Sequence, residues 1–157
     1  MGEFVQHLIA AQGYIELEMF EAAADELEQI DPQRRELPAV LACSVAVYTS
    51  MENWVLAERA AGQMVKLRPS LPECWVHWAY SAGCCQSLKV ARKILMDAEK
   101  LHPQNAMIQF HLGIYAGNVG DRDEAKSRLM AAITMDEKFR QVALDDPNLE
   151  SLWPEIT

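Results

Sequence analysis

The sequence predicts an all-α fold built from a repeated pair of helices, and three series of residues spaced 34 positions apart carry this prediction. The first series is four alanines: Ala23, Ala57, Ala91 and Ala125. The second series lies twelve positions earlier and consists of small or short residues: Ala11, Val45, Ala79 and Gly113. The third is a pair of prolines, Pro69 and Pro103. A fixed period of this length is typical of stacked helical repeats.

The clearest period shows why each repeat contains two helices. Apolar residues recur at i, i+3, i+4 and i+7 in the first half, as on one face of a helix: Trp75, Trp78, Ala79 and Ala82. A second such set follows: Ala91, Ile94, Leu95 and Ala98. Pro103 ends the second helix, because the residue before a proline disfavours helical geometry. Ala79 and Ala91 are small enough to let the two helices approach closely. We therefore expect all three repeat alanines after Ala23 to be buried.

The period divides the chain into units, which we expect to form a single domain over residues 1–157. The full units are 38–71, 72–105 and 106–139. The N-terminal unit, about 4–37, is irregular, because Asp31 and Pro32 arrive three residues early and shorten its second helix. Residues 140–157 are expected to cap the open end of the last repeat. Leu149, Leu152 and Trp153 are the predicted covering residues, and Asp146 is the predicted helix N-cap.

The residues of unit 106–139 resemble the tetratricopeptide repeat (TPR). The matching positions are Leu112, Gly113, Gly120, Asp121, Ala125, Leu129, Ala132 and Ile133. The unit departs from the pattern at Gln109, where a large aromatic is expected, and at Glu137, where proline is expected. The C-terminal segment resembles the closing segment of bacterial proteins of this kind. The resemblance implies a right-handed TPR-like solenoid of about four antiparallel helix pairs plus a C-terminal capping helix.

A second stripe of residues on the first helices is a candidate binding surface. In TPR proteins the first helices line a concave groove, so the resemblance places this stripe in the groove. The predicted groove residues are Ala42, Ala46, Val76, His77, Tyr80, Phe110, His111, Ile114 and Asn118. An exposed apolar surface usually marks an interaction site; the alternative is that a tight superhelix buries the stripe as extra core. The stripe has no Lys or Arg, which argues against a clamp for a peptide carboxylate.

Charge and composition narrow the classes of partner. The 157 residues carry a net charge of −9, and residues 1–40 alone carry −7. An acidic chain without a Lys/Arg cluster argues against nucleic acid and anionic membranes as partners. No apolar run approaches the ~18 residues of a membrane span, and we expect no targeting segment. The four cysteines lie within helical patterns, as suits free thiols in the reducing cytoplasm.

The sequence holds no catalytic motif, so we expect no enzyme, cofactor or bound metal. Cys74 and His77 have the spacing of two zinc ligands on one helix. Cys84 lies about 10 Å further along that helix, and even with His111 a fourth ligand is missing. The predicted function is a protein–protein interaction scaffold that binds an apolar peptide or helix in its groove. The alternatives are a chaperone resembling the small acidic TPR chaperones of bacterial secretion systems, a Cys/His metal or redox protein, and self-association.

Overall fold

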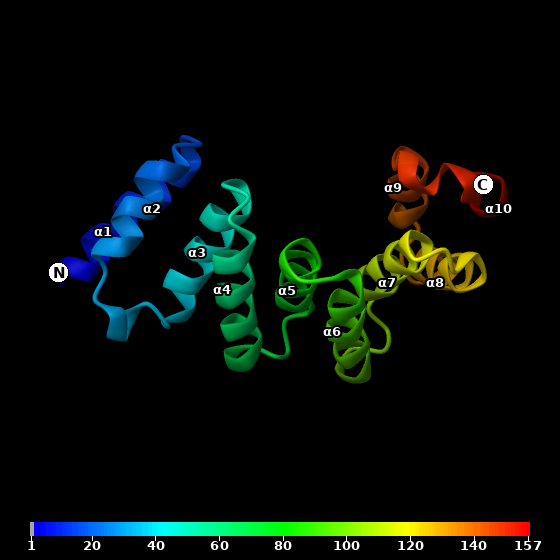
Figure 1. Ribbon diagram of the computed structural model, residues 1–157, viewed down its shortest axis with the longest axis horizontal. Coiled ribbons are helices and arrows are strands. Elements are labelled where there is room, and N and C mark those ends of the chain that lie inside the picture. The colour runs from blue at the N-terminus through cyan, green and yellow to red at the C-terminus, as the bar shows by residue number, and fades with distance from the viewer. Residues whose placement is uncertain (1) are drawn as a thin grey trace. The chain divides into compact units, whose positions relative to one another are not determined.

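The computed structural model describes residues 2–157, and within that range every regular element is a helix (Figure 1). Contacts group the chain into two compact units, Met1–Gln86 and Ser87–Thr157. The boundary falls inside the predicted repeat 72–105, between its two helices. The single-domain assignment and the contact between Ala79 and Ala91 therefore stay predictions.

The first unit contains five α-helices and one short 3-10 turn. They are α1 (Glu3–Glu16), α2 (Phe20–Gln29), η1 (Pro32–Arg34), α3 (Pro38–Ser50), α4 (Trp54–Leu67) and α5 (Pro72–Cys85). Within this unit, helices that follow one another in the chain pack against each other, as a helical repeat requires. The early end of α2 at Gln29 and the following turn confirm the predicted irregularity near Asp31, whose side chain accepts a hydrogen bond from the Gln33 amide at 2.8 Å.

The second unit contains the remaining helices and the C-terminal segment. They are α6 (Leu88–Leu101), α7 (Ala106–Asn118), α8 (Arg122–Met135), α9 (Lys138–Asp145), η2 (Pro147–Leu152) and α10 (Trp153–Ile156). The helix starts follow from local chemistry. Ser87, Asn105 and Asp121 each accept a hydrogen bond from an amide three residues later, which satisfies an otherwise unpaired donor. Asp146 does so two residues later, and it caps η2 rather than an α-helix.

Small residues bring helices together in both units. Ala57, Ala91 and Ala125 are all fully buried, which confirms the predicted burial of the repeat alanines. A Cβ placed on Gly113 of α7 would lie 2.9 Å from Leu129 Cγ and 3.3 Å from the Ala125 carbonyl oxygen of α8. In the first unit, a Cβ on Gly62 of α4 would lie 3.1 Å from the indole nitrogen of Trp78 on α5. That nitrogen also donates to Glu58 at 2.7 Å, so the Trp78 ring is held against α4.

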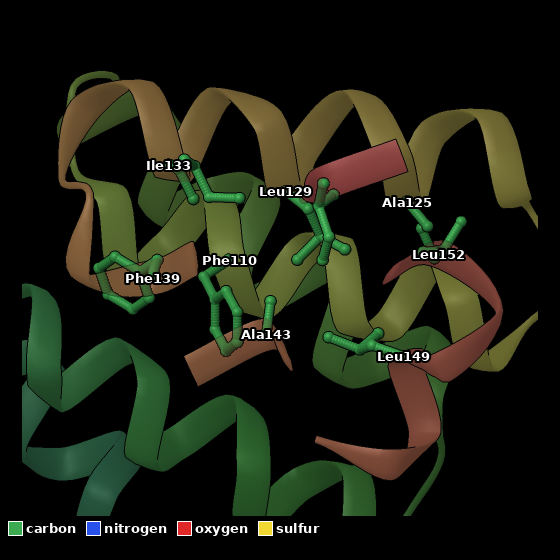
Figure 2. Close-up of a cluster of buried hydrophobic side chains, with 11 residues drawn as sticks. Phe110, Ala125, Leu129, Ile133, Phe139, Ala143, Leu149 and Leu152 are labelled. Carbon is green, nitrogen blue, oxygen red and sulfur yellow. The ribbon is translucent and has the colours of Figure 1, made fainter. Parts of the chain in front are cut away.

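The C-terminal segment covers the core of the second unit. Leu149, Leu152 and Ile156 join the same buried cluster as Leu129 and Ile133, and Figure 2 shows several of these side chains pointing toward one another. The partly buried Trp153 packs on this cluster and donates from its indole nitrogen to the Ala143 carbonyl at 3.0 Å. The predicted covering role of Leu149, Leu152 and Trp153 is confirmed. The covering segment begins slightly earlier than expected, because α9 starts at Lys138.

Candidate peptide-binding pocket

An apolar pocket of about 270 Å³ opens in the first unit between α3 and α5, with residues of α4 also lining it. Its lining is apolar except for two polar side chains near the start of α5. The lining residues are Ala42, Val45, Ala46, Ala61, Met64, Leu71, Glu73, Cys74 and His77. Ala61 is fully buried, whereas Ala42 and Ala46 are exposed, so the pocket runs from solvent down to the core.

Short side chains create this hollow. Ala42 and Ala46 lie one turn apart on α3, and the fully buried Ala61 adds no bulk on α4. One repeat later, the equivalent positions carry Val76, Tyr80 and Leu95, which are all larger. Because a larger side chain at those positions would fill the space, three alanines at one place in the repeat leave room for a group from outside.

The α5 side of the pocket combines a neutral thiol with two polar side chains. Burial raises the pKa of the Cys74 thiol, the nearby Glu73 carboxylate raises it further, and Arg68 opposes both. Cys74 is only 7% exposed, so it forms part of an uncharged wall. Glu73 and His77 are exposed and present polar groups to anything that enters.

Three of the predicted groove residues meet at this pocket: Ala42, Ala46 and His77. Val76 is half-buried and does not line it. Tyr80 is 48% exposed, and its ring meets Trp54 edge-on with centroids 5.4 Å apart. Tyr80 is therefore a surface aromatic of the same unit, supported from one side by α4.

The predicted groove residues of the second unit have a different environment. Phe110 is only 4% exposed, because Phe139 of α9 packs on it with ring centroids 5.0 Å apart (Figure 2). The expectation that Phe110 is an accessible wall residue is wrong, since the C-terminal segment folds over it. Ile114 packs against the same core, and His111 meets the Phe110 ring edge-on. Asn118, at the end of α7, is exposed.

The repeat pattern does not predict the pocket residues that come from α4 and from the start of α5. Ala61 and Met64 lie on α4, the second helix of its repeat, whereas the resemblance assigns the groove to the first helix of each repeat. One signal was available: Met64 stands where the repeat pattern expects a small alanine. For Cys74 the sequence predicts a free thiol within a helix, with zinc binding as the alternative, and not a groove residue. Within residues 2–157 no three His, Cys, Asp or Glu side chains come together as a metal site, and all four cysteines are free.

The consecutive helix pairs, the 34-residue period and the capped last repeat define a TPR-like helical repeat fold. No model of a known protein family matches the sequence, and no curated protein matches it either. No helix in the described part of the chain is long and apolar enough to cross a membrane.

Solved structures with the same fold are available for comparison. A crystal structure of MamA superposes with a TM-score of 0.78 at 15% identity, over 99% of this chain and 87% of that one. The MamA structure MSR-1 C2 gives a TM-score of 0.75 at 14% identity, with 87% and 79% covered. The thermophilic TPR protein TTC0263 of Thermus thermophilus gives 0.69 at 17% identity, with 98% and 82% covered. These likenesses establish the fold.

Proposed function

We propose that this protein is an interaction scaffold whose pocket between α3 and α5 receives an apolar side chain from a partner peptide or helix. The observation that carries the proposal is the open apolar pocket of about 270 Å³. Helical repeat proteins generally use the surfaces formed by their stacked helices to bind partners. Three residues of the stripe predicted to contact a partner line this pocket.

The size and lining of the pocket suit one large apolar side chain. An apolar cavity of about 150 Å³ is enough to hold benzene, so this pocket accommodates a leucine or phenylalanine side chain. Burying such a side chain stabilises a complex by about 1.5–3 kcal/mol. Backbone or polar contacts with His77 and Glu73 at the pocket entrance would orient the rest of the peptide.

Filling the pocket tests the proposal without removing any binding group. Ala46 is exposed, so Ala46→Phe places a ring over the pocket at little expected cost to the fold. A random-peptide display library is panned against the parent and against this variant. Ser127→Phe is the matched control, because it adds the same ring to an exposed position on α8, in the other unit.

The parent and the Ser127→Phe control should enrich the same peptides, each with a leucine, phenylalanine or similar anchor. Ala46→Phe should lose those peptides while its helical circular dichroism and melting temperature stay near those of the parent. If Ala46→Phe enriches the same peptides with the same affinity, the pocket is not the binding site. If the parent enriches no apolar anchor, the proposal fails as well.

A further inference from the structure

We infer that the partner segment is cationic, with a Lys or Arg next to the apolar side chain that enters the pocket and paired with Glu73. This inference rests on the proposed function and specifies the chemistry of the partner. It excludes an anionic peptide. It also disfavours a second copy of this chain as the occupant, since two copies that each carry −9 repel one another.

The local charges of the pocket favour a cation. Its nine lining residues include one carboxylate, Glu73, and neither lysine nor arginine. Glu73 is exposed and has no salt-bridge partner anywhere in residues 2–157. Arg68 also acts on this wall, but it lowers the pKa of the Cys74 thiol by less than Glu73 raises it. An unpaired carboxylate at the edge of an apolar hollow is complementary to a cation beside an apolar anchor.

The charges of the whole first unit act in the same direction. Residues 1–86 carry twelve acidic and five basic side chains, a net charge of −7. Within residues 2–86, the one salt bridge joins Glu26 to His7. Residues 87–157 carry eleven acidic and nine basic side chains, and several of their carboxylates are paired, including Asp97, Glu99 and Glu124. The uncompensated negative charge therefore belongs to the unit that contains the pocket, where it attracts a cationic segment and accelerates its association.

Three short synthetic peptides with a fluorescent label test the inference. All three share one central phenylalanine and one leucine; their flanking positions are lysine in the first, glutamine in the second and glutamate in the third. Dissociation constants are measured by fluorescence anisotropy at low and at physiological ionic strength, because salt screens exposed charges. The proteins are the parent over residues 1–157 and its variants Ala46→Phe, Glu73→Gln and Glu16→Gln. The last variant removes one exposed charge from the same unit, but away from the pocket.

We expect the lysine peptide to bind the parent most tightly and the glutamate peptide most weakly. Glu73→Gln should weaken binding of the lysine peptide by up to about fivefold, the upper end of the range for one exposed ion pair, and leave binding of the glutamine peptide unchanged. Glu16→Gln should have a smaller effect on the lysine peptide than Glu73→Gln, because it changes only the overall charge.

The possible failures are distinguishable. If the three peptides bind the parent equally and Ala46→Phe still removes binding, the proposed function stands and the cationic inference is overturned. The inference is also overturned if Glu16→Gln and Glu73→Gln weaken the lysine peptide equally, since the pairing at Glu73 is then absent. If no peptide binds the parent, or if Ala46→Phe binds all three as the parent does, the proposed function and the inference fail together.

Discussion

Two helices, α3 in the first unit and α7 in the second, use the same repeat position in opposite ways. Ala42 on α3 lies at an open pocket, whereas Phe110, two repeats later on α7, lies beneath Phe139 of α9. The positions are equivalent in sequence, yet one faces solvent and the other is core. Equivalent positions in the repeat therefore lie on the same face of their helices. The exposure of each side chain depends on what packs against that face.

The units also differ in how polar groups are satisfied. In the second unit, Gln109 is 5% exposed and occupies the position where the TPR pattern has an aromatic residue. Its amide nitrogen donates to Glu99 at 2.7 Å, and its amide oxygen accepts from Arg128 at 2.9 Å. Arg128 also pairs with Glu99 and Glu124, and Arg92 pairs with Glu124. Two acids and two bases therefore form a neutral network that joins α6, α7 and α8. The network supplies the hydrogen-bond partners that the buried Gln109 amide requires.

The largest expected effect on stability concerns Phe110, the buried member of this pair of positions. Phe110→Ala should destabilise the protein by about 3–5 kcal/mol, because it removes a buried aromatic and leaves a cavity beneath α9. Chemical denaturation followed by circular dichroism measures this loss. A variant as stable as the parent would show that Phe110 is a surface residue, as the sequence stripe suggested.

The two close helix contacts, at Gly113 and at Gly62, should lose different amounts of stability when a methyl group is added. Gly113→Ala is expected to cost about 1–3 kcal/mol, because the new methyl group meets the Leu129 branch point and a backbone oxygen. Gly62→Ala should cost less, since its Cβ would lie 3.1 Å from the Trp78 ring, a longer approach than at Gly113, and its nearest contacts would include no backbone atom. The same denaturation experiment compares both variants, and the reverse order would mean that Trp78 is held more firmly than Leu129.

The polar network of the second unit should make part of the stability depend on pH. Burial alone would raise the pKa of Glu99, but hydrogen bonds from Gln109 and Arg128 outweigh it and lower that pKa below the ordinary 4.5. The ionised network therefore stabilises the fold above pH 4.5, and this contribution is lost as the pH falls through the lowered value. Glu99→Gln should lower the stability by about 1.5 kcal/mol at pH 7, the lower end of the range for a hydrogen bond to a charged group, and the difference from the parent should shrink in acid. A difference that is constant with pH would exclude the ionised network.

We expect glycine to increase the stability of the protein at two turns of the first unit. Glu18 and Glu52 adopt φ of 56° and 55°, in the left-handed region, one repeat apart. The equivalent turn of unit 106–139 has Gly120 with φ of 85°. Glycine adopts this conformation without the Cβ penalty. Glu52→Gly should therefore stabilise the protein by up to about 1 kcal/mol, seen as a higher melting temperature.

Arg59→Gly is the matched control for Glu52→Gly. Arg59 is exposed in the middle of α4, where glycine is unfavourable, so this variant should be less stable than the parent. Equal losses in both variants would show that the turn carries no strain.

The smallest expected effect concerns the exposed aromatic of α5. Tyr80→Ala should lower the stability by no more than about 1 kcal/mol, the value of its edge-on contact with Trp54. Thermal unfolding compared with Phe110→Ala gives the contrast between the two regions directly. A loss as large as that of Phe110→Ala would make Tyr80 part of the core of its unit.

The spacing of residues along the chain was enough to predict the helical repeat, its 34-residue period and the buried alanines. It also predicted the cap formed by Leu149, Leu152 and Trp153. These features follow from local rules, because helical periodicity defines which side of a helix is apolar, and caps and prolines define where it ends. Which residues of the stripe remain exposed depends on how the helices pack, and the residue spacing does not predict it. Phe110 became core because α9 folds back over it, and the pocket near Ala42 acquired its depth from Ala61 and Met64 on another helix. Exposure is a property of neighbours that are distant in the chain, and the pattern of a single helix does not contain them.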